Sequence, residues 1–402
     1  MEPTIRIKGF ESEWSKQKAQ EIFKTYDDRN HPELPVLSAC QDIRGMAPRS
    51  TSGYDIFHDK ANEVTYKRVL PGQFVIHLRS FQGGFAHSAI EGICSPAYTV
   101  FEFKNKDEHD DYYWKHVLRS RAFIERLPLI TYGIRDGRSI SFNEFSDLAF
   151  SFPEKSEQSA IASFLKKMYD QIENTEKKIK SLRQMRVASL QAMFPQKGAT
   201  KPQIRFKGFE DKWVTGKLSK FATRIMRKNK NLETTLPITI SAAEGLVAQD
   251  SFFNNIVASS NLRGYYLMKK GEFAYNKSYS SNYPFGAVKR LEKYDMGALS
   301  TLYIVFTLNE NISSDYIVHF FDTSLWHNEV AMRAAEGARN HGLLNIGAED
   351  FLDINIVYPN SIKEQNMIAN YFSTLDKQIS LEEQKFESLK RIKSACLDKM
   401  FV

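Results

Sequence analysis

The chain of 402 residues contains few cysteines and no long apolar run. Cys40, Cys94 and Cys396 are odd in number and far apart, which argues against a disulfide framework and for a reducing compartment. No apolar run approaches the roughly 20 residues that a membrane-crossing helix needs. The opening MEPTIRIKGFESEW lacks the basic and then apolar build of a signal peptide. These absences predict a cytoplasmic protein without a membrane partner.

The sequence also lacks the motifs of enzymes that modify DNA. An adenine methyltransferase would need an Asn/Asp-Pro-Pro-aromatic loop and a glycine-rich cofactor loop. NYPF at Asn282 lacks the second proline, and FQGGF at Phe81 lacks the spacing of a cofactor loop. The histidines and cysteines show no metal-ligand spacing, and a Walker loop is absent. We therefore expect no catalytic residue, no metal ion and no cofactor of the chain's own.

What the sequence does contain is a repeat of itself. Four blocks recur in the same order, 199 to 207 residues apart. They are IRIKGFESEW (5–14) with IRFKGFEDKW (204–213), GICSPAYTVF (92–101) with GALSTLYIVF (297–306), GRSISFNEFSDLAFSFP (137–153) with GLLNIGAEDFLDINIVYP (342–359), and 157–194 with 364–401. The last pair aligns without a gap and is identical at 14 of 38 positions. The chain is therefore a duplication.

Between these blocks the two halves have little in common. Residues 40–90 and 240–290 share hardly more than a Leu-Pro opening, at Leu34 and Leu236. A constant frame around divergent bodies suits a protein that performs one task on two different targets. The bodies, near 15–153 and 214–359, predict a mixed α/β (α+β) fold with more strand than helix, because QFVIHLRS, AYTVFEF, LYIVFTL and INIVYP are β-branched and aromatic runs of strand length. HDDYYWKHVLRSRAFIERL and SSDYIVHFFDTSLWHNEVAMRAA predict matching helices late in each body.

The fourth block predicts one long helix in each half. Its apolar positions repeat about every 3.5 residues, and neither copy is interrupted by glycine or proline. At about 1.5 Å per residue, 38 residues make a rod of about 57 Å. A single rod would leave its apolar stripe in water, so we expect the two to pack as an antiparallel coiled coil; the alternative is that each rod lies on its own domain. The expected core is Leu165, Met168, Ile172, Ile179 and Leu182 in the first rod and Phe372, Leu375, Ile379, Phe386 and Leu389 in the second, with Met185 and Ile392 continuing the pattern.

These features together resemble the specificity subunit of type I restriction–modification systems. The resemblance is carried by the junctions FPEKSEQSAIASFL (152–165) and YPNSIKEQNMIANYF (358–372), by the rod endings LQAMFP and LDKMFV, and by the paired KGFE…W openings. It implies two target-recognition domains joined by two long antiparallel helices, with a pseudo-two-fold repeat. One departure is that PEKSEQ is one residue shorter than PNSIKEQ, which would shift the helix phase.

The resemblance implies a non-catalytic reader of double-stranded DNA. Such a subunit recruits two modification subunits, which bring S-adenosylmethionine and methylate adenine N6, and two restriction subunits in the full complex. The rival hypotheses are a coiled-coil scaffold without a DNA role and a stand-alone DNA-modifying enzyme. The net charge of +7 and the pI near 9.0 suit a polyanionic partner.

Five segments follow from this interpretation. Residues 1–153 and 214–359 would form the target-recognition domains, 154–194 and 360–402 the long helices, and 195–213 the linker with the repeated opening. Each opening would complete the end of the other half, which would bring the chain's two ends close together. Trp14 and Trp213 in the openings would either dock the methyltransferases or anchor each body as buried side chains.

DNA contacts are expected in the loops between strands, where arginine and amide side chains offer the hydrogen-bonding groups that read guanine and adenine. The candidates in the first body are Arg79, Ser80, Gln82, Arg135 and Arg138; those in the second are Asn276, Lys277, Tyr279, Ser280, Asn282, Arg339, Asn340 and His341. Because the two sets differ, the target should consist of two different short sequences that flank an unread spacer.

Overall fold

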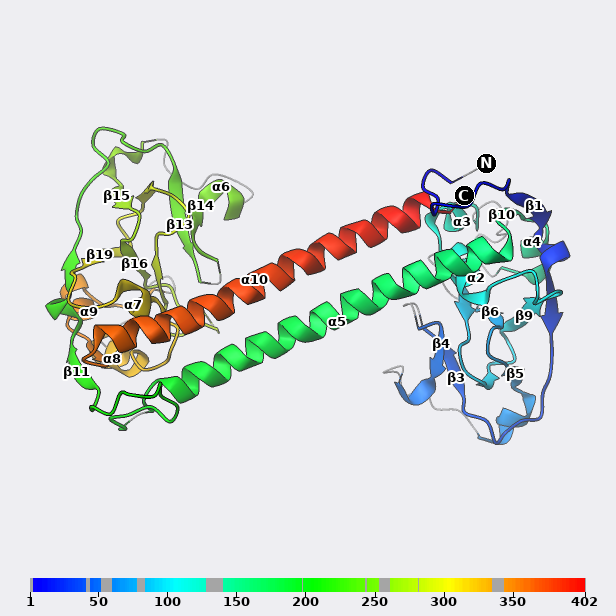
Figure 1. Cartoon of the computed structure of the whole chain (residues 1–402), viewed down its shortest axis with the longest axis horizontal. Helices are drawn as coiled ribbons and strands as arrows, with labels where there is room; N and C mark the ends of the chain where they lie inside the picture. The colour runs from blue at the N-terminus through cyan, green and yellow to red at the C-terminus, as the bar shows by residue number, and fades with distance from the viewer. Residues whose placement is uncertain are drawn as a thin grey trace. The chain divides into compact units, whose positions relative to one another are not determined.

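A computed structural model (Figure 1) describes residues 3–40, 44–51, 60–77, 84–127, 140–196, 198–242, 244–252, 261–280, 282–334 and 343–401. The chain forms two compact units, Met1–Lys177 with Glu383–Val402 and Lys178–Glu382. Each unit contains one sheet-rich body and portions of both long helices, α5 (Lys155–Met193) and α10 (Ile362–Lys399).

The first unit is built around an antiparallel four-stranded sheet. The strand order is β2-β9-β6-β7, and the pairs β1-β10, β3-β4 and β5-β8 complete the body. The strands are β1 (Ser15–Lys18), β2 (Phe23–Tyr26), β3 (Leu37–Ala39), β4 (Met46–Pro48), β5 (Lys67–Val69), β6 (Phe74–Ile76), β7 (Phe85–His87), β8 (Gly92–Cys94), β9 (Thr99–Phe103) and β10 (Ala149–Phe152). The helices are α1 (Ala19–Ile22), α2 (Asp111–Val117), α3 (Arg121–Ile124) and α4 (Phe142–Ser146), with 3₁₀ turns η1 (Arg49–Thr51) and η2 (Lys60–Thr65).

The second unit contains two four-stranded sheets. One has the order β12-β19-β16-β17, the other β14-β13-β18-β15, and β11 pairs with β20. The strands are β11 (Val214–Lys217), β12 (Ala222–Arg224), β13 (Pro237–Ser241), β14 (Gly245–Ala248), β15 (Tyr266–Lys269), β16 (Phe273–Asn276), β17 (Ala287–Arg290), β18 (Met296–Leu299), β19 (Ile304–Leu308) and β20 (Asn355–Tyr358). The helices are α6 (Gln249–Phe252), α7 (Ser314–Phe320), α8 (His327–Arg333) and α9 (Ala348–Leu352), with 3₁₀ turns η4 (Leu218–Lys220) and η5 (Leu262–Gly264).

The divergent bodies share one topology that their sequences conceal. The order β2-β9-β6-β7 is repeated as β12-β19-β16-β17, antiparallel throughout. The turn into the third strand contains Gly72 in the first body and Gly271 in the second, with φ of 83° and 88°, a conformation that favours glycine. Gln73 and Glu272 follow, and each side chain accepts the backbone N–H three residues before it at 2.8 Å.

Each long segment expected as one helix late in the body is divided into two. Residues 109–127 form α2 and α3, because Ser120 caps a new helix by accepting the N–H of Phe123 at 3.1 Å. The described residues of the other segment, 313–334, divide in the same region into α7 and α8.

The rods α5 and α10 pack antiparallel, as predicted. In the first unit, Leu165 near the start of α5 shares a hydrophobic core with Met400 and Phe401 at the end of α10. In the second unit, Phe372 near the start of α10 shares a core with Phe194 at the end of α5. The start of each helix also packs into the body of its own half, so the two packing alternatives occur together.

The predicted core positions of the rods are buried to different degrees. Leu165, Met168, Ile179, Phe372, Leu375 and Ile379 are buried, whereas Ile172, Leu182, Phe386 and Leu389 are partly buried. Met185 and Ile392 are 49% and 48% exposed, although the apolar pattern extends to them. The next residue, Arg186 or Lys393, faces the partner helix instead, where Arg186 pairs with Asp376 and Lys393 lies over the ring of Tyr169.

Candidate nucleic-acid interface

Five of the residues predicted to contact DNA lie at the end of β16 and in the loop that leads to β17. Asn276 ends β16, and its Oδ1 accepts the N–H of Ser278 at 2.9 Å. Further along, Ser280 and Tyr283 exchange two backbone hydrogen bonds of 3.1 Å. Tyr279 is 38% exposed, and Ser280 and Asn282 are exposed as well. The described part of the loop therefore has backbone hydrogen bonds of its own and presents polar and aromatic side chains to solvent.

A second loop ends beside the first. Lys277 accepts the N–H of Leu344 at 2.9 Å, and Ser278 forms an isolated antiparallel bridge with Leu343. The predicted residues Arg339, Asn340 and His341 lie outside the described residues, as do Arg79, Ser80, Gln82, Arg135 and Arg138. The sequence still connects Arg339 to His341 with the first loop, because their segment leads directly into Leu343, which bridges Ser278.

The described end of the equivalent hairpin in the first unit is closed in the same way. His77 donates its N–H to the carbonyl of Gly84 at 2.8 Å, just beyond the paired strands β6 and β7. Asn276 and Ala287 form the last register pair of β16 and β17. The segment that carries Arg79, Ser80 and Gln82 thus follows the same hairpin as the segment that carries Asn276 to Asn282.

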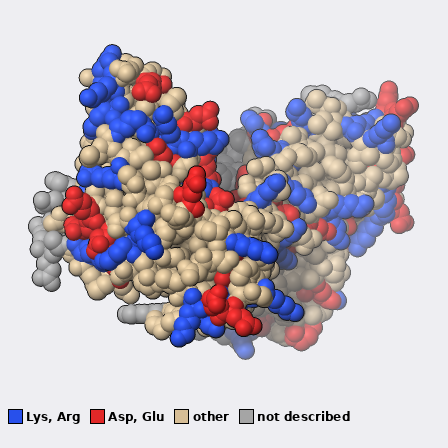
Figure 2. Space-filling view, turned by 60° about the vertical axis from the view of Figure 1, so that its left-hand side comes forward, with Lys and Arg blue, Asp and Glu red and all other residues tan. Residues whose placement is uncertain are grey.

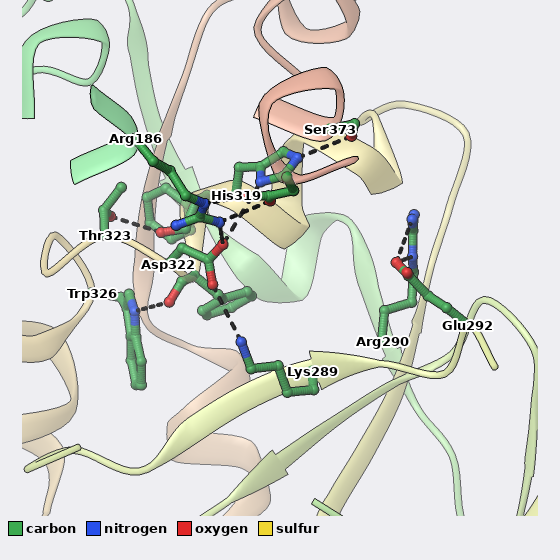
Figure 3. A network of polar contacts seen from close by, with 12 residues as sticks. Arg186, Lys289, Arg290, Glu292, His319, Asp322, Thr323, Trp326 and Ser373 are labelled. Atoms are coloured by element: carbon green, nitrogen blue, oxygen red, sulfur yellow. Dashed lines mark hydrogen bonds and ion pairs between the residues drawn. The ribbon is translucent and has the colours of Figure 1, made fainter. Parts of the chain in front are cut away.

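A charged network lies behind the second-unit loop (Figure 3). Asp322, which follows α7, accepts Arg186 Nη2 at 2.6 Å and lies 3.3 Å from Lys289 Nζ on β17. Arg186 also binds Asp376 on α10, and His319 Nε2 lies 3.2 Å from the Ser373 hydroxyl. The network therefore connects the strand after the loop to both long helices.

A pocket of about 300 Å³ joins the loop and the network. It is lined by loop residues Asn282 and Tyr283 and by Lys289, Asp322 and Arg186, among others. The pocket therefore lies between the loop and charged side chains of β17 and α5.

Electrostatics keep the network ionised. Burial alone would raise the pKa of Asp322, but the hydrogen bond with His319 and the charges of Lys289 and Arg186 outweigh it and hold this pKa well below its usual range. Burial alone would lower the pKa of Arg186, and Asp376 and Asp322 raise it instead. The carboxylate and the guanidinium are both charged at neutral pH.

The first unit retains the histidine of this network but has different residues at two other equivalent positions. By the repeat, His116, Tyr169 and Lys393 correspond to His319, Asp376 and Arg186. His116 stacks on Tyr169 with centroids 5.7 Å apart and planes inclined by 9°, and Lys393 Nζ lies 4.9 Å from the centroid of the same ring. The ionic network is therefore particular to the second half.

The repeated Glu-Gln pair connects each rod to its surroundings. Glu157, fully buried, binds Arg6 of the first opening through two contacts of 2.8 Å, and Glu364, 1% exposed, binds Arg205 of the second at 2.7 and 2.9 Å. The sequence singled out this Glu-Gln pair only as a family signature. Its structural role could not be predicted, because the arginine partner lies some 150 residues away in the sequence.

The glutamines make matching contacts. Gln158 accepts the N–H of Asp110 at 3.0 Å and donates to the carbonyl of Pro153 at 2.8 Å. Gln365 accepts from Ser313 at 2.8 Å and donates to Pro359 at 2.9 Å. Both helices begin two residues before the glutamate, so the extra residue of PNSIKEQ is accommodated before the helix and does not shift its phase.

The openings close each half onto the opposite helix end. Ile5 donates its N–H to the carbonyl of Lys399 at 3.1 Å, and Ile204 donates to Ala192 at 2.8 Å. Trp213 is 5% exposed and its Nε1 lies 3.3 Å from Glu364 Oε1, which favours the buried-anchor interpretation for this tryptophan. Trp14 is half-buried.

The described part of the chain contains neither a membrane-spanning helix nor a metal-ligand cluster. None of its helices combines the length and the apolar character needed to cross a membrane. No group of three or more His, Cys, Asp or Glu side chains in that part is placed to hold a metal ion.

Comparison with known proteins identifies the family. Two solved structures share the fold: a type I restriction–modification S subunit from M. genitalium (14% identity, TM-score 0.57, 100% of this chain and 99% of that one) and the HsdS subunit from Thermoanaerobacter tengcongensis (15% identity, TM-score 0.50, 96% of both chains). No curated protein matches significantly. The family model described as the type I restriction modification DNA specificity domain matches residues 12–184 and 249–391. The chain therefore belongs to the DNA specificity subunits of type I restriction–modification systems, which are not themselves catalytic.

Proposed function

We propose that this chain reads a bipartite, asymmetric duplex target, with one short sequence for each half and an unread spacer between them. The observation that carries the proposal is the repeated sheet order, β2-β9-β6-β7 and β12-β19-β16-β17, with different residues in the hairpin after the third strand. The first half has LRSFQGG there and the second has KSYSSNYPFG. One backbone frame with two different sets of side chains suits two different half-sites.

Each half would combine phosphate contacts with base contacts. The candidate readers are Arg79, Ser80, Gln82, Arg135 and Arg138 in the first half and Asn276, Lys277, Tyr279, Ser280, Asn282, Arg339, Asn340 and His341 in the second. Arginine pairs with guanine and asparagine or glutamine with adenine through two hydrogen bonds each. The hydrogen bonds that Asn276 and Ser280 make within the described part of the loop support this role, because backbone that is already ordered loses less entropy on binding.

Each segment of the chain would have its own role. Residues 1–153 and 214–359 would read DNA, 195–213 would connect the halves, and 154–194 and 360–402 would set the spacing. Half-sites on one face of DNA lie about 34–36 Å apart, and helices of 39 and 38 residues span about 57 Å at 1.5 Å per residue. The rods are therefore long enough to fix the spacer.

The chain would recruit the catalytic subunits in the cytoplasm. Two modification subunits would bind S-adenosylmethionine and methylate adenine N6 within the target, and two restriction subunits would join in the full complex. The chain's own contribution is recognition.

Methylome sequencing tests the proposal. Cells that contain this chain and its partner subunits should carry N6-methyladenine in one asymmetric two-part motif, and deletion of this chain alone should remove that motif. Persistence of the motif after deletion would refute the proposal. Measurement of DNA binding against salt distinguishes a scaffold: a DNA reader with several phosphate contacts loses at least about tenfold in affinity between 50 and 200 mM salt, whereas a scaffold binds no DNA.

A further inference from the structure

A row of cationic side chains follows two neighbouring segments of the second unit, 224–230 and 263–270. Leu267 donates its N–H to the carbonyl of Arg227 at 2.8 Å, and Lys228 bridges Tyr266 in antiparallel fashion. The two segments therefore run side by side in opposite directions. They contain seven cations and no acid: Arg224, Arg227, Lys228, Lys230, Arg263, Lys269 and Lys270. We call these seven residues the basic ribbon.

Most of the basic ribbon faces solvent. Arg227 is held by Glu272 at 2.9 Å, and Lys228 lies 4.3 Å from the centroid of Tyr266. The other five are exposed, namely Arg224, Lys230, Arg263, Lys269 and Lys270. The acidic neighbour of Lys270, Asp295, is 3.8 Å away and 92% exposed, so it neutralises little in water. Figure 2 shows Lys and Arg side chains gathered on the lobe at the upper left, which carries β15 in Figure 1.

The first unit has the same backbone arrangement without this charge. Arg68 donates its N–H to the carbonyl of Asp28 at 2.7 Å, and Arg29 bridges Lys67, each 199 residues before its counterpart. The equivalent segment, TYDDRNH at 25–31, contains two acids where the second unit has Met226 and Arg227.

Two arginines of the equivalent segments in the first unit are paired with these and other acids. Arg29 pairs with Asp27 at 2.7 Å, and Arg68 pairs with Asp28 at 3.2 Å and with Glu91 at 2.6 Å. The hydrogen bond from Arg29 lowers the pKa of Asp27, which is the direction expected of an ion pair. The difference between the halves is therefore one of charge and not of backbone.

The size and place of the basic ribbon fit a DNA backbone. Seven residues at about 3.3 Å each span about 20 Å, and one DNA strand carries a phosphate about every 3.4 Å along the axis. Lys269 and Lys270 come just before β16, and Asn276 at the other end of β16 begins the loop between β16 and β17. From its first to its last residue β16 rises by about 10 Å, which corresponds to about three base pairs.

We infer that the basic ribbon binds the phosphates of DNA next to the half-site read by the second half, and that the first half makes no equivalent contact. The second half would then contact more phosphates than the first half. This inference rests on the proposed function and adds to it a second, sequence-independent surface. The charge complementarity with a polyphosphate backbone favours DNA over an acidic protein partner.

The test removes three exposed lysines from the full-length chain: Lys230→Gln, Lys269→Gln and Lys270→Gln together. The matched control removes three exposed lysines of the first unit: Lys16→Gln, Lys60→Gln and Lys104→Gln. Affinity for the target duplex is measured from 50 to 200 mM salt, and thermal unfolding confirms that both variants fold. Each lost phosphate contact reduces the slope of log K against log salt by about 0.9, so the ribbon variant should lose up to about 2.7 and the control much less.

A second experiment locates the phosphate contacts of the basic ribbon along the DNA. Neutral methylphosphonates placed beside the second half-site should weaken binding by the wild-type chain and have no further effect on the ribbon variant. The same substitutions beside the first half-site should weaken both proteins alike.

Equal slopes in the ribbon variant and the wild type would overturn the inference. So would equal losses in the ribbon and control variants, or a ribbon variant that loses a partner protein while it binds DNA normally. If the wild-type chain binds no DNA specifically, the proposed function fails instead, so the two failures are distinguishable.

Discussion

The buried pair between Arg205 and Glu364 is expected to hold the second opening onto the start of α10. Glu364 is 1% exposed and accepts Arg205 Nε and Nη2 at 2.7 and 2.9 Å. Arg205→Met keeps most of the side-chain length but leaves a carboxylate in the core with Trp213 Nε1, at 3.3 Å, as its remaining side-chain contact. Breaking a buried ion pair from one side costs about 3–5 kcal/mol. We expect the lower end, about 3 kcal/mol, because the tryptophan still donates.

Thermal unfolding measures this cost. For a unit of about 200 residues, 1 kcal/mol corresponds to about 2–4 °C, so Arg205→Met should lower the Tm of the second unit by about 6–12 °C. Calorimetry of the full chain is suited to this test, because two units can unfold in separate transitions. The same reasoning applies to Arg6→Met opposite Glu157 in the first unit.

A double-mutant cycle separates the pair from other effects. Adding Glu364→Gln to Arg205→Met removes the uncompensated charge and should restore a large part of the lost stability. The control is the surface pair of Glu173 and Lys177, which are 62% and 69% exposed; Lys177→Met should change the Tm by less than about 2 °C. A loss below about 1 kcal/mol for Arg205→Met, or additive effects in the cycle, would refute the reasoning.

Three further predictions concern the chain ends, the long helices and His116. A permuted chain that begins at Lys201, with its original ends joined by a short linker, should still bind the target, because Ile5 already bonds to Lys399; loss of binding in a gel-shift assay would contradict this. Deleting one seven-residue repeat from 172–185 and the matching repeat from 379–392 should change the spacer length of the methylated motif and leave both half-sites as they are; altered half-sites would count against rods that only set spacing. Burial lowers the pKa of His116 to about 3, so the unfolded chain binds a proton between pH 6.5 and 3 that the folded chain excludes, and stability falls as the pH falls. His116→Phe should therefore remove about 2 kcal/mol of the stability lost between pH 6.5 and 5, which urea unfolding at the two pH values would detect as a flatter profile.

The long helices could be predicted because their signals are local. The apolar period, the absence of glycine and proline, and Pro195 all lie within one segment, and α5 ends at Met193 as these signals require. Exposure of Met185 could not be predicted in the same way. It depends on Arg186 turning toward Asp376, a residue 190 positions away.

The topology shared by the two bodies could not be predicted from the sequence, because strand pairing is non-local. In the turns before β6 and β16 the two halves retain Gly72 and Phe74 as Gly271 and Phe273, too few identities to stand out against divergent flanks. The polar network around Asp322 gave no local signal either, since its members come from α5, β17, α7 and α10. Comparison of the two halves does provide a signal, because Arg186 and Asp376 stand where Lys393 and Tyr169 stand in the other half.

The proposal that each half reads a different short sequence is tested most directly by making the two halves alike. In this variant, residues 214–359 are replaced by a second copy of residues 15–153, and the methylated motif is determined by long-read sequencing. The pseudo-two-fold repeat predicts a palindromic motif in which the half-site of the first body appears on both sides of the spacer. Retention of the original asymmetric motif, or a direct repeat of one half-site, would contradict the account.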